Sequence, residues 1–78
     1  MRAERWNAYP LGMLKVGIIG CGFMGRMHAN VYGLLEGAEL VAAADLKKEK
    51  AEALGVPGYA TLEAMLAAHD LDVVDVCL

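Results

Sequence analysis

Short apolar runs alternate with stretches of helical periodicity along most of this chain. The runs that predict β-strands lie at residues 15–19, 40–44, 59–60 and 73–78. Between them, the periodicity predicts helices over residues 23–35 and 47–54, and a third helix that begins after Thr61. Strands that alternate with helices through short turns form parallel sheets with right-handed crossovers. We therefore predict an α/β fold with a doubly wound parallel sheet and strand order 3-2-1-4.

The predicted helix over residues 23–35 carries its larger apolar side chains within one arc. That arc contains Met24, Met27, His28, Val31, Leu34 and Leu35. We expect the arc to pack in the core. His28 is then a packing residue, because no acid or nucleophile stands near it at catalytic spacing. Gly25 and Ala29 form a small-residue flank that favours close contact with the sheet.

The first predicted strand runs directly into Gly20, Gly22 and Gly25, which have the spacing G-x-G-x-x-G. In this pattern the first glycine allows a tight turn, the second lets a pyrophosphate approach the backbone, and the third lets the helix lie close to the sheet. Phe23 and Met24 begin the helix, whose free N–H groups and dipole favour a phosphate. Because a strand precedes the glycines and a helix follows them, these five residues predict a cofactor-binding turn of the Rossmann type.

Asp45 ends the second apolar run, 20 residues after Gly25. At that position of a nucleotide-binding unit, a carboxylate accepts hydrogen bonds from the adenosine ribose hydroxyls. The competing interpretation is a helix cap or turn residue, but the glycines upstream favour the ribose. A carboxylate there repels a 2′-phosphate, which predicts NAD as the cofactor. NADP is the alternative, because Lys47 and Lys48 would soften that repulsion.

The remaining polar and sulfur-bearing residues predict structural roles. Thr61 is placed to cap the helix that follows it, and His69 is expected on the surface near the end of that helix. Asp75 interrupts the last apolar run, so we expect its carboxylate near the strand end, solvated or bonded to backbone. Cys21 and Cys77 have neither the number nor the spacing of a disulfide framework or a metal site, and we expect both to be reduced packing residues. The alternative for Cys21 is a reactive thiol, because a helix N-terminus lowers a thiol pKa.

Composition limits the classes of function. The chain has 78 residues, which allows at most one small domain. A net charge of −3 provides no basic face for nucleic acid. No apolar run approaches the roughly 18 residues needed to cross a membrane, and residues 1–13 lack the apolar segment of a secretory signal. These features predict a cytoplasmic protein with no nucleic acid or membrane partner.

The chain divides into an N-terminal extension and one folded unit. Residues 1–12 show no clear periodicity and are expected to lie outside the fold, so either Met1 or Met13 starts the protein. Residues 13–78 contain no repeat, linker or low-complexity tract, which predicts one continuous unit.

The motifs of this unit also resemble a known family. The glycine turn is joined to Met-Gly-x-x-His-Ala at residues 24–29, and matching segments follow at residues 40–45, 59–66 and 75–78. Over residues 13–78 the sequence resembles the N-terminal part of the glucose-fructose oxidoreductase, inositol dehydrogenase and MocA (Gfo/Idh/MocA) family. Members are NAD(P)-dependent oxidoreductases, typically of sugars, cyclitols or related polyols. The resemblance implies that the matching glycines hold the pyrophosphate and that Asp45 holds the ribose.

In that family, the strand that matches residues 75–78 leads into a Thr-Pro loop beside the nicotinamide. A later strand ends in Glu-Lys-Pro, whose lysine assists proton transfer, and a substrate domain follows. None of these features occurs in the 78 residues, so no catalytic residue is predicted here. The resemblance implies the NAD(P)-binding portion of a longer, homo-oligomeric dehydrogenase, with a substrate domain that is absent from this chain.

Two alternatives stay open at this point. One is a non-catalytic module that holds or senses NAD(P). The other keeps the fold and changes the ligand to FAD or S-adenosylmethionine, although Gly25 and the Met-Gly-x-x-His-Ala segment depart from the methyltransferase pattern.

Overall fold

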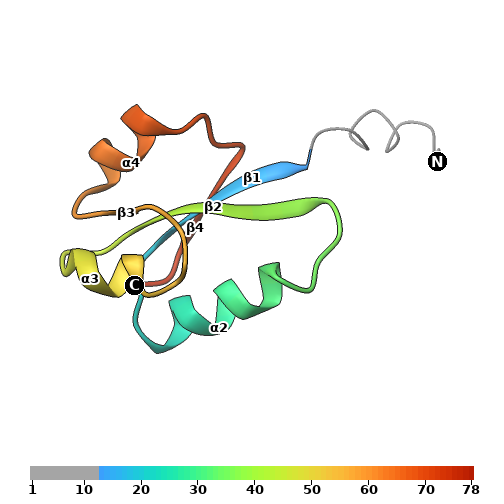
Figure 1. Ribbon diagram of the computed structural model, residues 1–78, viewed down its shortest axis with the longest axis horizontal. Coiled ribbons are helices and arrows are strands. Elements are labelled where there is room, and N and C mark those ends of the chain that lie inside the picture. The colour runs from blue at the N-terminus through green and yellow to red at the C-terminus, as the bar shows by residue number, and fades with distance from the viewer. Residues whose placement is uncertain (1–12) are drawn as a thin grey trace.

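The computed structural model describes residues 13–78, so the expected extension over residues 1–12 lies outside the described part. Its elements are β1 (Leu14–Ile19), α2 (Phe23–Tyr32), β2 (Ala38–Ala44), α3 (Lys48–Glu52), β3 (Gly58–Tyr59), α4 (Leu62–Ala68) and β4 (Val73–Val76) (Figure 1). The four strands are parallel and follow the order β3-β2-β1-β4. The predicted fold class and strand order are therefore confirmed.

Helices cover both faces of the sheet. Helices α2 and α3 lie on one face and α4 lies on the other (Figure 1). Under α2 and α3, one apolar core is formed by Ile18, Cys21, Ala43 and Ala51. Under α4, a second core is formed by Ala42, Ala44 and Met65. The crossover through α4 places β4 on the other side of β1 from β2, so the strand order reverses between β1 and β4.

The prediction that the apolar arc of α2 packs in the core was wrong. Its apolar side chains are about half exposed or more, with Met24 at 50%, Met27 at 45% and Leu34 at 85%. The sheet is instead contacted by the small-residue flank, since Gly25 is buried and Ala29 and Tyr32 pack against the core. A Cβ atom on Gly25 would overlap the carbonyl oxygen of Gly20. This close approach fixes the rotation of α2 and turns the methionines away from the sheet.

The other boundaries are close to those predicted. Helix α2 ends at Tyr32 rather than at residue 35, and α3 is shorter than residues 47–54. Thr61 caps α4 as predicted, because its Oγ1 accepts a hydrogen bond from the Ala64 amide at 3.1 Å. His69 ends α4 as predicted and is partly exposed, and its Nε2 lies 2.8 Å from the Tyr59 hydroxyl. Over residues 13–78, no helix is long and apolar enough to cross a membrane.

Candidate dinucleotide site

The glycine turn joins the end of β1 to the start of α2, and its three glycines have different surroundings. Gly20 has a φ of +90°, which side-chain-bearing residues rarely adopt, and a Cβ there would lie 2.7 Å from the Cys77 carbonyl oxygen. Gly25 contacts Gly20 as described above. Gly22, in contrast, has no atom within 4 Å of the position of an added Cβ. Gly20 and Gly25 thus shape the turn, whereas Gly22 leaves open space beside its backbone.

The N-terminus of α2 faces this open space. Gly22 is the N-cap residue and contributes no side-chain cap, and the first turn of the helix holds no acidic residue. Phe23 and Met24 are exposed at this end, at 75% and 50%. The amides of an uncapped first turn are unsatisfied within the helix and favour an anion through the helix dipole. The ten-residue helix therefore presents uncapped amides beside the open space at Gly22, an arrangement that favours an anion.

Asp45 lies at the carboxyl end of β2 and holds the glycine turn directly. Its Oδ2 accepts a hydrogen bond from the Cys21 amide at 2.8 Å, and its Oδ1 accepts one from the Lys47 amide at 2.8 Å. These two bonds, opposed in part by burial and assisted by the charges of Lys50 and Lys47, keep the pKa of Asp45 below its ordinary value. The side chain is thus an ionised carboxylate, and its remaining lone pairs can still accept hydroxyl hydrogen bonds.

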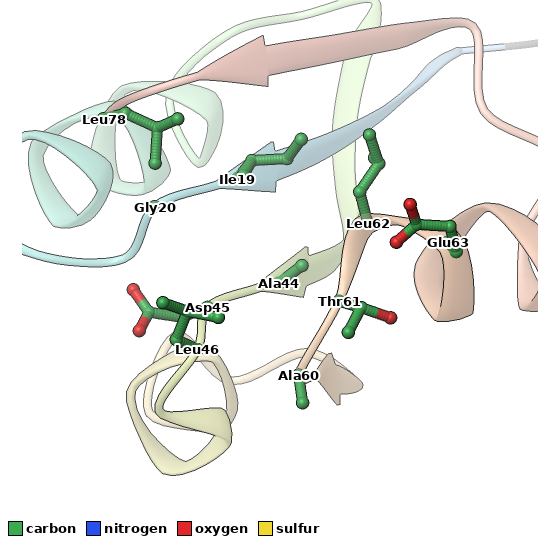
Figure 2. Close-up of a pocket in the computed structure, with 10 residues that line it drawn as sticks. All are labelled: Ile19, Gly20, Ala44, Asp45, Leu46, Ala60, Thr61, Leu62, Glu63 and Leu78. Carbon is green, nitrogen blue, oxygen red and sulfur yellow. The ribbon is translucent and has the colours of Figure 1, made fainter.

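A pocket of about 350 Å³ adjoins Asp45 at the carboxyl ends of the strands. Figure 2 shows that its lining comes from the ends of β1 and β2, from the segment that enters α4 and from Leu78 after β4. The lining residues are Ile19, Gly20, Ala44, Asp45, Leu46, Ala60, Thr61, Leu62, Glu63 and Leu78. Most are apolar, and the volume falls near the lower end of the roughly 300–1,000 Å³ of small-molecule sites. The pocket's size and largely apolar lining are those of a small-molecule site.

Residues 60–63 also belong to this site, although their own sequence carries no signal that predicts it. Their position follows from the strand order, because β3 lies beside β2 and the loop after β3 emerges next to Asp45. In parallel sheets, ligands bind at the carboxyl ends of the strands. Combining this rule with the predicted order 3-2-1-4 could have found the segment before the structure did.

A polar network lies on the α2 face of β4, and its centre is Asp75. The Asp75 Oδ2 accepts hydrogen bonds from His28 Nδ1 at 2.7 Å and from the Tyr32 hydroxyl at 2.9 Å. The Cys77 thiol donates to Asp75 Oδ1 at 3.5 Å. The expectation that this carboxylate would be solvated or bonded to backbone was therefore wrong. Strand β4 carries Asp75 on the face covered by α2, where side-chain donors are in reach.

Ionisation in this network follows from its geometry. Burial raises the pKa of Asp75, but hydrogen bonds from His28, Tyr32 and Cys77 outweigh burial and keep the pKa below its ordinary value. Burial and the Asp75 carboxylate raise the pKa of Tyr32 to about 12 and that of Cys77 to about 11. His28, Asp75 and Cys77 also have the chemistry of metal ligands, with their ligand atoms within 4.8 Å of one another. Those atoms are already paired with each other, so hydrogen bonding accounts for the arrangement.

Both cysteines are free, as expected. Cys21 is buried, and its thiol donates to the Ala44 carbonyl oxygen at 3.4 Å. Burial, followed by the nearby Asp45 charge, raises the pKa of Cys21. The thiol is protonated at neutral pH, which argues against the alternative of a reactive nucleophile.

Comparison with known proteins identifies the family of this chain. The family described as oxidoreductase with an NAD-binding Rossmann fold, Gfo/Idh/MocA, matches residues 14–78. D-apiose dehydrogenase of Paraburkholderia graminis is 39% identical over 67 residues, covering 80% of this chain and 18% of that protein. Inositol 2-dehydrogenase/D-chiro-inositol 3-dehydrogenase of Lacticaseibacillus casei is 39% identical over 69 residues, covering 80% of this chain and 20% of that protein.

A solved structure shows the same fold. Myo-inositol dehydrogenase from Lactobacillus casei, in complex with NAD(H) and myo-inositol, has a TM-score of 0.72 and 36% identity, over 83% of this chain and 21% of that chain. The chain spans about a fifth of the length of the relatives that it matches. The match over residues 14–78, together with the parallel sheet and the glycine turn, shows that this chain belongs to the Gfo/Idh/MocA family of oxidoreductases.

Proposed function

We propose that residues 13–78 form the NAD-binding portion of an oxidoreductase that transfers hydride between nicotinamide and a sugar, cyclitol or related polyol. The observation that carries this proposal is the open backbone at Gly22. It lies at an uncapped helix N-terminus, and the neighbouring turn residue Cys21 bonds the ionised carboxylate of Asp45. This combination fits a dinucleotide, since a diphosphate needs bare amides and a ribose needs a nearby hydrogen-bond acceptor.

The proposal gives the residues distinct roles. The backbone at Gly22, Phe23 and Met24 binds the pyrophosphate, while Gly20 and Gly25 hold the turn in shape. Asp45 accepts hydrogen bonds from the adenosine ribose, and the adjoining apolar pocket takes the adenine. When NAD is bound, its nicotinamide supplies the hydride chemistry.

The charge of Asp45 supports NAD over NADP. An ionised carboxylate at the ribose repels a 2′-phosphate, and the hydrogen bonds from Cys21 and Lys47 keep Asp45 ionised at neutral pH. The Lys47 amide, rather than its ammonium group, bonds to Asp45.

The substrate class rests on the relatives. D-apiose dehydrogenase and the inositol dehydrogenases act on polyhydroxylated substrates, as their names state. Because the match spans only about a fifth of each relative, we place the substrate-binding and catalytic residues of the proposed enzyme outside residues 13–78.

Gly22→Ala tests the cofactor site with little effect on the fold. The added methyl group meets no protein atom, so thermal stability is expected to change little, but the methyl occupies the space proposed for the pyrophosphate. Isothermal titration of the intact protein should then show NAD affinity reduced by about tenfold or more, equivalent to at least roughly 1.4 kcal/mol.

Gly33→Ala is the matched control, because Gly33 ends the same helix with a φ of −66° and lies far from the turn along α2. It should bind NAD as the unmutated protein does. Full NAD affinity in Gly22→Ala would contradict the proposed site. NAD binding by the intact protein without oxidation of any polyol would favour the non-catalytic module instead.

A further inference from the structure

Helix α2 packs on the sheet through Gly25, Ala29 and Tyr32 rather than through its larger apolar side chains. Gly25 is the one buried residue of the helix, and it has no side chain. Strand β4 lies on the other side of β1 from β2 and carries Asp75 on the face covered by α2, whereas Val74 and Val76 alternate onto the opposite face. Polar contacts to Asp75 therefore add to the packing of Ala29 and Tyr32 in fixing α2 against β4.

The network around Asp75 supplies this connection. His28 and Tyr32 are four residues apart and lie on the same face of α2, and both donate to Asp75 Oδ2. The ionised Asp75 carboxylate can only accept, so His28 Nδ1 carries the proton in this pair. Hydrogen bonds to a charged acceptor are about twice as strong as neutral ones.

The same strand also contacts the glycine turn. The Cys77 amide donates to the Ile19 carbonyl oxygen at 2.8 Å, and the Cys77 carbonyl oxygen occupies the space beside Gly20. Strand β4 is thus bonded to the residue before the turn, and through Asp75 to the helix after it. A change in the orientation of α2 relative to β4 would redirect the amides at the helix N-terminus.

We propose that Asp75 is a positioning residue for dinucleotide binding, acting through His28 and Tyr32 to hold the N-terminus of α2 in the orientation that receives the pyrophosphate. The inference rests on the proposed function. It assigns to Asp75 a role in affinity without any contact with the cofactor. The adenine pocket is built mainly from the ends of β1 and β2 and from residues 60–63, and Leu78 is its one lining residue from the end of β4. Adenosine binding should therefore depend much less on the network than pyrophosphate binding does.

The test compares NAD with adenosine, because adenosine occupies the proposed pocket and lacks the pyrophosphate. Binding to the intact protein is measured by titration calorimetry for NAD and by nuclear magnetic resonance for adenosine. Asp75→Asn should weaken NAD binding about tenfold, the effect expected for loss of a hydrogen bond to a charged group, and should change adenosine binding less than about twofold. Tyr32→Phe should show the same selectivity with a smaller loss, because it removes one donor and keeps the ring.

Two further variants separate positioning from general stability. His28→Leu should weaken NAD binding, whereas His28→Asn should restore most of the affinity, because the asparagine amide supplies an N–H donor in place of Nδ1. Asp72→Asn is the matched control. Asp72 Oδ2 accepts from the Lys15 amide at 2.8 Å, at the opposite end of β1 and β4, so this variant should leave NAD affinity unchanged.

The outcomes distinguish the two proposals. If the unmutated protein binds neither NAD nor adenosine, the proposed function is refuted and the positioning role falls with it. If the protein binds NAD and Asp75→Asn binds it equally well, or loses NAD and adenosine affinity to the same extent, the positioning role is refuted and the proposed function stands. If Asp75→Asn does not fold, the Tyr32 and His28 variants decide by the same criteria.

Discussion

Asp45→Asn tests the two roles that the structure gives to one carboxylate. Asparagine keeps the size of the side chain, but it has one acceptor oxygen where the carboxylate has two. One of the two bonded amides, at Cys21 or Lys47, then faces an NH₂ group. Because Lys47 is exposed, water can replace its bond, and the side chain is expected to turn its oxygen to the half-buried Cys21 bond.

The stability cost of Asp45→Asn is therefore moderate. Loss of one charged hydrogen bond at an exposed amide lowers the free energy of unfolding by about 1 kcal/mol. In a domain of roughly 60–100 residues, that loss lowers the melting temperature by about 4–8 °C. Thermal unfolding followed by circular dichroism measures it, with Asp70→Asn, an exposed aspartate after α4, as the control.

The effect of Asp45→Asn on cofactor preference is larger. Loss of a charged acceptor for the ribose hydroxyls should weaken NAD binding about tenfold. A carboxylate about 5 Å from a 2′-phosphate repels each unit of phosphate charge by roughly 1–3 kcal/mol, for effective dielectric constants between about 80 and 20. Asp45→Asn removes this repulsion. Screening at this exposed site favours the lower figure, so NADP binding should improve by about tenfold. The ratio of the two dissociation constants should then shift by roughly a hundredfold in favour of NADP.

Isothermal titration with both cofactors at low ionic strength measures this ratio. Added salt should reduce the gain in NADP affinity, because the relieved repulsion is electrostatic. Equal affinities for NAD and NADP in the unmutated protein would refute the assignment of Asp45 to the ribose. An unchanged ratio in Asp45→Asn, with the expected loss of stability, would show that the carboxylate only holds the turn.

The same carboxylate makes stability depend on acid pH. The folded state keeps the pKa of Asp45 below its ordinary value of 3.8, so its stabilising contribution is fully present above that pH. The contribution is lost as pH falls through the lower pKa of the folded state. As pH is lowered from about 5, the free energy of unfolding measured by urea denaturation should therefore fall less in Asp45→Asn than in the unmutated protein. Equal losses in both proteins would contradict the bonding described for Asp45.

Three other predictions follow from single features of the structure. Gly25→Ala should prevent folding or lower stability by several kcal/mol, because its Cβ would overlap the Gly20 carbonyl oxygen; thermal unfolding compared with Gly22→Ala checks this. Thr61→Ala should cost about 1 kcal/mol through loss of the cap to the Ala64 amide, and Thr61→Ser should retain most of that stability. A polypeptide limited to these 78 residues should self-associate through the unpaired edge of β4, which sedimentation velocity at several concentrations would detect. A monodisperse monomer that unfolds cooperatively would contradict the last prediction.

The features that the sequence predicted well depend on neighbouring residues. The turn follows from the glycine spacing, because Gly20 and Gly25 meet local steric requirements of the turn and the helix, whereas Gly22 leaves open space. The strand order follows from alternating elements and the handedness of their crossovers. The cap at Thr61 is likewise a contact between residues three apart.

The features that could not be predicted from the sequence depend on contacts between residues far apart in the chain. Periodicity identified the apolar arc of α2 but not the face turned to the sheet, which is set by the approach of Gly25 to Gly20. The bond between Asp45 and the Cys21 amide joins residues 24 apart, and the bond between Asp75 and His28 joins residues 47 apart. Neither pair could be recognised from spacing, because no local rule relates their positions.

These two long-range bonds have a common consequence for the site. Asp45 extends from the end of β2 to the turn, and Asp75 extends from β4 to the helix that follows the turn. Both carboxylates have a lowered pKa, so at neutral pH each presents a full negative charge to its donors. The amides proposed to bind the pyrophosphate are thus held from both sides of β1 by acids, neither of which is proposed to contact the phosphates. Affinity for the diphosphate should therefore depend on residues that a motif of glycines alone does not include.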